Sequence, residues 1–316
     1  MVQALIGFPR HSANVSYRGG SWETDYPVTA LSSLPLSRVA RSTSLDPEDT
    51  VIIGELPARK VVQLLVLCGH NLSTPKAKYR VRLSRATPWS PAAEQVNMTA
   101  DTTEVTADST EITADNGNLS TQIYDSGWLD VWPRLPARLV SWNKGNFWLR
   151  KYRPEEIANY TWYLPHFIPG SKFAGSFRID IDDPGNPNGY VQIGMVEVAQ
   201  ALELEANPSY GAQYGYDARS RVTEADGGAQ YFERLNKPRR FVGTIEVMSR
   251  DFAQVGIFEL QRQQDLDQPF FWWPDRDDEI HTIRNAFLAR QAELGLLAYA
   301  FPNYDAAPVN FREVLG

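Results

Sequence analysis

Short strand-forming runs separated by turn residues constrain this chain most, because they favour a β-sandwich or jelly roll over a helical architecture. The clearest example is the segment 50–84, in which the apolar run 61–68 fits a buried strand. Tyr79, Val81 and Leu83 then alternate with basic residues, which is typical of a strand with one solvent-exposed face. The predicted fold class is therefore mostly β.

Similar runs recur along the rest of the chain. Ser249 fits the N-cap of a helix, with Asp251 in its first turn, and Phe252, Val255 and Phe258 follow at helical spacing. We therefore predict one clear helix, over about 250–264. Further strands are predicted at 122–129, 137–142, 147–152, 176–181, 190–198, 220–225, 229–235 and 239–248.

The length of 316 residues is enough for two domains, and a change of composition near 207–211 predicts the boundary between them. We predict an extended N-terminal arm over 1–25, a jelly roll over 26–206, and a smaller β domain with one helix over 207–316.

An internal repeat interrupts the first domain. Three copies of a seven-residue motif begin at Met98, Val105 and Ile112, but one apolar anchor per copy and many threonines disfavour a coiled coil. We predict an acidic, Thr-rich insertion over about 92–121, either solvated without a role or a contact patch for a neighbouring subunit. Its six acids account for most of the net charge of −7, since 32 acids and 31 bases remain elsewhere. This balance argues against a nucleic-acid partner.

The sequence offers little for catalysis or cofactor binding. It has four histidines and one cysteine, and it lacks an HExxH pair, a nucleophile elbow, a P-loop and a dinucleotide fingerprint. Cys68 fits a small buried hydrophobe, and His70 fits a turn histidine. No apolar run reaches the ~18 residues needed to span a bilayer, and the amino terminus does not resemble a secretory signal. We predict no enzyme activity, cofactor, metal site or membrane span.

Paired carboxylates are harder to exclude, because glycoside hydrolysis needs only two acids about 5–10 Å apart. The best candidates are Asp180, Asp182 and Asp183, which precede a turn rich in Pro, Gly and Asn. Turn chemistry is the favoured interpretation, and a Ca²⁺ loop or an active site are the alternatives. The segment lacks the Gly and Glu of an EF-hand loop.

Two aromatic segments stand out. Trp142, Trp148 and Trp162 lie near amides such as Asn143, and aromatic faces with amide donors suit a glycan. Core packing or a protein interface is the favoured alternative there. The second segment, 270–273, has four consecutive aromatic residues that include Trp272 and Trp273. Four such side chains cannot all point into one core, which predicts a docking surface.

The order of these segments resembles a known family. The segments 29–41 and 61–83 and the closing strand 193–198 look like the galactose-binding-like (discoidin-type) jelly roll, as do the turn Gly69-His70-Asn71-Leu72-Ser73 and the run Tyr124-Asp125-Ser126-Gly127-Trp128. The remainder is similar to tail-tip and baseplate proteins of long-tailed bacteriophages, through Tyr210-Gly211, Phe258-Glu259-Leu260-Gln261-Arg262 and Phe271-Trp272-Trp273-Pro274-Asp275. The insertion at 98–115 departs from this pattern, and the sugar-binding residues of lectin members have no matching positions.

The resemblance implies a structural subunit of a tail tip or baseplate, made in the bacterial host cytoplasm and located at the virion tail tip. Such a subunit would link tail tube, hub and fibres. Its partners would be other baseplate proteins and copies of itself, in trimers or hexamers. The alternative is a carbohydrate-binding module that recognises a host surface glycan, and a polysaccharide-degrading enzyme ranks third.

Overall fold

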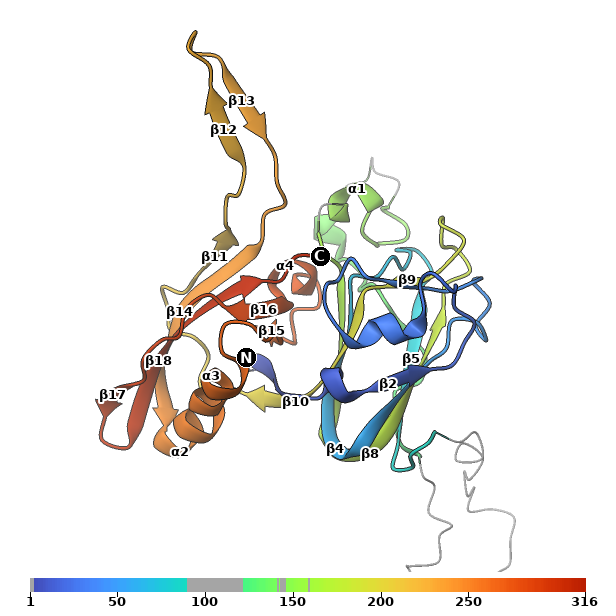
Figure 1. Cartoon of the computed structure of the whole chain (residues 1–316), viewed down its shortest axis with the longest axis horizontal. Coiled ribbons are helices and arrows are strands. Elements are labelled where there is room, and N and C mark those ends of the chain that lie inside the picture. The colour runs from blue at the N-terminus through green and yellow to red at the C-terminus, as the bar shows by residue number, and fades with distance from the viewer. Residues whose placement is uncertain (1–2, 90–121, 141, 143–145, 159) are drawn as a thin grey trace, which may run out of the picture.

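The computed structural model describes residues 3–89, 122–140, 142, 146–158 and 160–316, so the predicted insertion and Asn143 lie outside the described residues. Strands dominate the chain (Figure 1), which confirms the predicted fold class. The elements are β1 Leu5–Arg10, η1 Ser12–Asn14, β2 Ser16–Arg18, η2 Val28–Ser32, β3 Ala40–Arg41, β4 Ile52–Cys68, β5 Lys78–Ser84, β6 Gln122–Asp125, β7 Leu129–Asp130, η4 Ala137–Leu139, α1 Pro154–Ile157, β8 Tyr163–Asp182, β9 Gln192–Ile193, β10 Met195–Glu203, β11 Gln213–Tyr216, β12 Arg221–Glu224, β13 Gln230–Glu233, β14 Arg239–Ser249, α2 Arg250–Phe252, η5 Ala253–Phe258, α3 Glu259–Gln264, β15 Phe270–Trp273, α4 Thr282–Asn285, β16 Phe287–Gln291, β17 Ala298–Phe301 and β18 Tyr304–Glu313.

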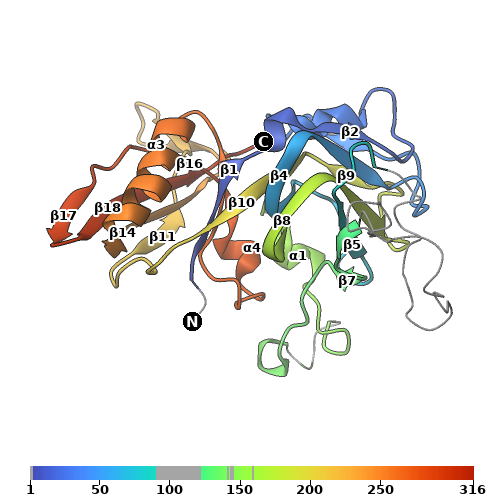
Figure 2. The same cartoon turned by 90° about the horizontal axis from the view of Figure 1, so that it is seen from below.

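One antiparallel sheet runs through both halves of the molecule, in the order β11-β14-β18-β16-β15-β1-β10-β4-β8-β5-β6. Strand β1 joins the halves, because Leu5 lies opposite both Glu203 of β10 and Trp273 of β15. Figure 2 shows β1 and β10 between the two halves. The segment predicted as an extended arm thus contributes a central strand, whose Leu5 and Ile6 are fully buried.

Strand β4 has one face in each of two hydrophobic cores. Leu65 and Leu67 belong to the core of the first half, which we call the first core. Leu64, Val66 and Cys68 belong to the second core, on the other face of the same strand. Because successive side chains of a strand point to opposite faces, a strand between two cores must be apolar at every position. This explains the nearly continuous apolar run at 61–68, in which the half-buried Gln63 is the one polar residue, and it confirms Cys68 as a buried hydrophobe.

The predicted helix over 250–264 is present, with α2, η5 and α3 following one another without a break. The Ser249 hydroxyl accepts a hydrogen bond from the Phe252 amide at 3.3 Å and caps its N-terminus, as predicted. Ile257 and Leu260 bury the inner face of this helix in the second core. No helix among the described residues is both long and apolar enough to cross a membrane.

The aromatic segment of β15 is buried, so the predicted docking surface at 270–273 is wrong. Trp272 and Trp273 are only 1% and 7% exposed. The Trp272 ring lies 5.1 Å from that of Phe311, and the Phe271 ring lies 5.9 Å from Tyr163. Strands β1 and β16 pair with the two edges of β15, and side chains of the second core cover both of its faces. Alternation along this strand therefore buries all four rings.

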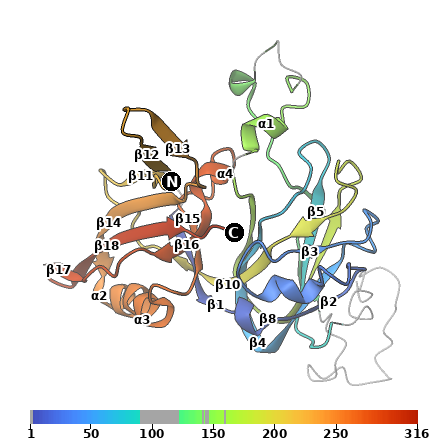
Figure 3. The ribbon, with the colours of Figure 1, turned by 45° about the horizontal axis from the view of Figure 1, so that its top comes forward.

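A two-stranded hairpin formed by β12 and β13 projects away from both halves (Figures 1 and 3). We call residues 217–238, which carry it, the arm. Every residue of β12 and β13 is exposed, including Val222 at 54% and Phe232 at 63%. The strands turn at 226–228, where Gly228 adopts a φ of +81°. The strands predicted at 220–225 and 229–235 are therefore confirmed, and they pair as one hairpin.

Candidate functional site

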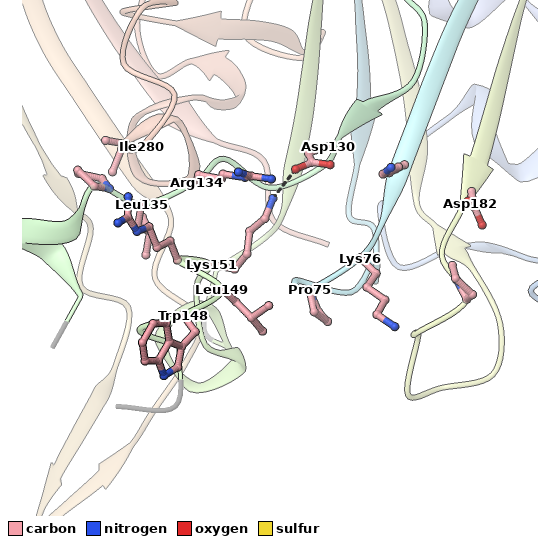
Figure 4. A pocket seen from close by; sticks show the side chains of 14 residues that line it. Pro75, Lys76, Asp130, Arg134, Leu135, Trp148, Leu149, Lys151, Asp182 and Ile280 are labelled. Carbon is pink, nitrogen blue, oxygen red and sulfur yellow. Dashed lines mark hydrogen bonds and ion pairs between the residues drawn. The ribbon is translucent and has the colours of Figure 1, made fainter. Parts of the chain in front are cut away.

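A cleft opens beside the ends of strands β5, β7 and β8, in the first half of the molecule (Figure 4). Its first lobe has a volume of about 970 Å³ and its second lobe a volume of about 680 Å³. Pro75, Leu149 and Lys151 line both lobes and make them one continuous cleft, which we call the aromatic cleft. Each lobe lies within the size range of small-molecule sites, which is about 300–1,000 Å³.

Aromatic side chains form one rim of the aromatic cleft. Trp148 lines the first lobe and is 83% exposed, and Trp142 beside it is 73% exposed. The two rings lie 6.3 Å apart, and Phe147 packs edge-to-face against both at 5.2 and 5.4 Å. Exposed indole faces held by edge contacts leave a flat apolar surface, against which the C–H face of a sugar ring can stack.

Charged groups from three adjacent strands face the first lobe. Lys78, at the start of β5, lies directly opposite Asp130 of β7 and Asp182 of β8. Directly opposed residues project to the same face of a sheet, so both carboxylates flank Lys78. Figure 4 shows Asp182 across the lobe from Trp148, with Lys76 between them. The aromatic rim and the polar wall thus face each other.

Lys151 fixes the geometry of this wall. Its ammonium group donates to Asp130 at 2.9 Å and also to the carbonyl of Trp132. The hydrogen bond from Lys151 lowers the pKa of the Asp130 carboxyl, and the charges of Lys151, Lys78 and Arg134 lower it further. Asp130 is therefore ionised at neutral pH, which suits hydrogen-bond acceptance from a hydroxyl rather than proton donation.

Amide and indole groups line the second lobe. The Asn146 side chain donates to the Lys151 carbonyl at 3.0 Å, and its amide oxygen is buried without a partner among the described residues. Trp162 is half-buried, donates to the Ile157 carbonyl at 2.9 Å and packs edge-to-face on Trp132 at 5.3 Å. The hydrogen bond from Asn146 to Lys151 helps to fix the turn at 146–150 beside the second lobe.

His70 lies beneath this lobe, between the rings of Trp132 and Trp162 at 5.9 and 5.8 Å. Burial lowers its pKa to about 3, and its Nδ1 accepts from the Leu72 amide at 3.3 Å. It is neutral at physiological pH and its hydrogen bond holds the turn after β4. The interpretation of His70 as a turn histidine is therefore confirmed.

Two of the three candidate carboxylates are structural. Asp183 is fully buried and accepts from the Ser73 amide at 2.7 Å and from Asn186 at 3.1 Å, which confirms turn chemistry at this residue. Asp180 is paired with Arg82 at 2.7 Å. Only Asp182 reaches the cleft. Within the described ranges, no group of three His, Cys, Asp or Glu side chains could hold a metal ion.

The structure separates the aromatic residues named from the sequence. Trp148 lies on the rim of the cleft with Trp142 packed beside it, and Trp162 lies in the second lobe, whereas Trp272 and Trp273 are in the second core. Sequence analysis missed the basic residues of the first lobe, because they come from three separate segments. The lobe is lined by Lys76, Lys78, Arg134, Arg150 and Lys151.

Comparisons with known proteins give little guidance. No family model and no curated protein matches the sequence. A family 32 carbohydrate-binding module of Clostridium perfringens NanJ, solved with galactose, is 11% identical with a TM-score of 0.32, covering 62% of this chain and 99% of the module. A second structure, Clostridium perfringens CpGH89 in complex with its substrate GlcNAc-α-1,4-galactose, is 13% identical with a TM-score of 0.31. The match covers 64% of this chain but only 16% of that protein. Similarity at these TM-scores does not assign a function.

Proposed function

We propose that this chain is a non-catalytic carbohydrate-binding protein that takes a glycan in the aromatic cleft. The observation that carries this proposal is the highly exposed indole of Trp148, which faces a wall of fixed polar groups across the first lobe and has the exposed ring of Trp142 packed beside it. Two exposed tryptophans contribute little to the stability of the fold, whereas covering a large apolar side chain with a ligand would contribute about 1.5–3 kcal/mol.

The polar groups of the cleft can bind the hydroxyl groups of a sugar whose C–H face stacks on the indole. Hydroxyl groups both donate and accept, and the cleft offers Lys76 and Lys78 as donors and Asp130 and Asp182 as acceptors. Catalysis is not part of the proposal, because the lowered pKa of Asp130 removes one of the two carboxylates of the first lobe as a proton donor.

Binding of the full chain to immobilised glycans and to polysaccharides in native gels tests this proposal. Trp148→Ala should weaken binding about tenfold or more, which corresponds to ~1.4 kcal/mol of lost stacking. Trp128→Ala is the matched control, because Trp128 is 47% exposed but lines neither lobe. Failure to bind any glycan, or equal binding by the Trp148 variant, would overturn the proposal.

The second candidate is the structural one, a tail-tip or baseplate subunit that binds copies of itself. The arm favours it, because a two-stranded hairpin that packs on nothing is marginally stable in water. Val222 and Phe232 lie opposite each other and share one exposed face of this hairpin. A neighbouring subunit that covers this face would stabilise the arm. A host-attachment subunit could combine both functions, since the arm and the cleft share no residues.

Light scattering tests the second candidate. We expect the full chain to form a defined oligomer, such as a trimer or hexamer, and the double variant Val222→Ser/Phe232→Ser to have a smaller mass. Tyr210→Ser is the control, because Tyr210 is fully exposed but lies outside the arm. A monomeric full chain, or an oligomer unaffected by the double variant, would exclude this role for the arm.

A further inference from the structure

The first lobe of the aromatic cleft is positively charged on a chain whose net charge is −7. Five cationic side chains line it, against the two carboxylates Asp130 and Asp182, which leaves a balance of +3. The cations are Lys76, Lys78, Arg134, Arg150 and Lys151. Such a local excess of one sign in a concave site attracts ligands of the opposite sign.

Most of this positive charge is available to a ligand. Lys151 is half of an ion pair, because its ammonium group binds Asp130. Among the described residues, no carboxylate lies within ion-pairing distance of Lys76, Arg134 or Arg150, and all three side chains are exposed. Unpaired cations on one concave wall repel one another, so an anion between them would be stabilised.

The backbone holds one of these cations in an uncommon conformation. Arg150 has a φ of +52°, in the left-handed region that non-glycine residues rarely occupy. Its amide donates to Asn146 at 2.8 Å and its carbonyl accepts from Leu135 at 2.6 Å. These bonds connect the turn that carries Trp148 to the segment that carries Arg134. Strain of this kind persists where surrounding contacts fix it, and it often marks a functional site.

We propose that the ligand of the aromatic cleft is an anionic carbohydrate, whose carboxylate or sulfate group lies among Lys76, Arg134 and Arg150 while a sugar ring stacks on Trp148. This inference rests on the proposed function and adds the chemical class of the glycan. The guanidinium groups supply paired donors that match the oxygens of a carboxylate or sulfate. A neutral sugar would leave these donors with water alone.

Matched polysaccharides test the inference on the full chain. Polygalacturonate, alginate and hyaluronan would each be compared with the carboxyl-reduced form of the same polymer, and dextran sulfate with dextran. At least one acidic polymer should bind about tenfold or more tightly than its neutral counterpart, as expected for losing one charge-assisted hydrogen bond. The preference should shrink as salt is raised. The carboxylate and sulfate arms identify which anionic group the cleft takes.

Variants that remove positive charges test whether the preference for acidic polymers arises in the cleft. Lys76→Gln/Arg134→Gln should bring the acidic polymer close to its neutral counterpart, whereas Arg219→Gln/Lys237→Gln on the arm should leave the ratio unchanged. All four side chains are exposed, so both variants should keep the wild-type thermal midpoint. Ratios that fall equally in the two variants would mean that the whole chain, not the cleft, attracts anions, and would overturn the inference.

The remaining outcomes separate the two proposals. Equal binding of acidic and neutral forms, lost in Trp148→Ala, would keep the proposed function and overturn the anionic preference. No binding to any polymer would overturn both. If an oligonucleotide of matched charge competes equally, and Trp148→Ala has no effect, the site is a general polyanion surface and the carbohydrate inference fails.

Discussion

Two aromatic-rich segments of this chain differ in solvent exposure. The indoles of Trp142 and Trp148 are 73% and 83% exposed, whereas those of Trp272 and Trp273 in β15 are 1% and 7% exposed. The difference lies in the backbone around them. Strand β15 is paired on both edges and covered on both faces, while the rings of Trp142 and Trp148 pack mainly on each other and on Phe147. Aromatic content alone therefore does not distinguish a core from a binding surface.

The largest effect on stability is expected from a substitution in the buried aromatic segment, β15. Trp272→Ala should lower the free energy of unfolding by about 3–5 kcal/mol, because it leaves a cavity between Phe241 and Phe311. Trp272→Phe should cost clearly less, since the Trp272 indole N–H has no partner among the described residues and its removal loses no hydrogen bond. Denaturant unfolding measures both. An alanine variant as stable as the wild type would show that β15 is not part of the core.

Acid should weaken the first half, where two buried histidines lie. Burial lowers the pKa of His166 to about 4 and that of His70 to about 3, from an ordinary value of 6.5. Both are neutral in the folded chain and become protonated in the unfolded chain first. Their stabilisation is therefore complete above pH 6.5 and is lost as pH falls towards 4 and then 3, by up to about 3 kcal/mol for His166.

Unfolding free energies measured between pH 7.5 and pH 4 check this expectation. His166→Gln removes the titrating group and keeps an amide that can bind the hydroxyls of Tyr79 and Tyr124, which lie 3.1 and 2.9 Å from the imidazole. The slope of stability with pH should flatten in this variant. A slope equal to that of the wild type would mean that His166 is not buried as a neutral group.

Substitution of the exposed indoles should, by contrast, change the stability of the fold very little. Trp142→Ala and Trp148→Ala should each change the free energy of unfolding by less than about 0.5 kcal/mol, the usual range for surface positions. Ring contacts at 6.3 Å between the two should give a small coupling in the double variant. Chemical denaturation of the two single variants and the double variant measures this. A loss above about 2 kcal/mol in either single variant would place these indoles in the core instead.

Much of the fold could be predicted from local pattern. The capped helix at 250–264, the hairpin around Asp226–Gly228 and the strand at 61–68 each depend on neighbours in the sequence, so the residues themselves specify them. The partition between two cores could not be predicted. It depends on β1, β4, β8 and β10 meeting across nearly 200 residues, and on a sheet whose two faces belong to different cores.

The candidate site divides in the same way. Trp142 and Trp148 could be named, because they are near each other in the sequence. The cationic wall could not, because Lys76, Arg134 and Arg150 come together only through the pairing of β5 with β7 and β8 and through the bonds of the turn at 146–150. Asp183 shows the converse. Its position beside Asp182 suggested shared chemistry, but Asp183 is fully buried in the turn, where it accepts hydrogen bonds from Ser73 and Asn186.

The arm offers the smallest and sharpest test of the comparison, since its aromatic residues lie in strands yet stay exposed. Phe232→Ser should change the unfolding free energy of a dilute sample by less than about 0.5 kcal/mol, because Phe232 packs on little in one copy. If a second copy covers the arm, the wild-type melting temperature should rise with protein concentration, by mass action, and that dependence should weaken in the variant. Calorimetry over a hundredfold range of concentration measures both. If the wild-type melting temperature does not depend on concentration, no second copy covers the arm, and aromatic residues in a strand can remain exposed. The burial of β15 would then be explained by its pairing with a strand at each edge.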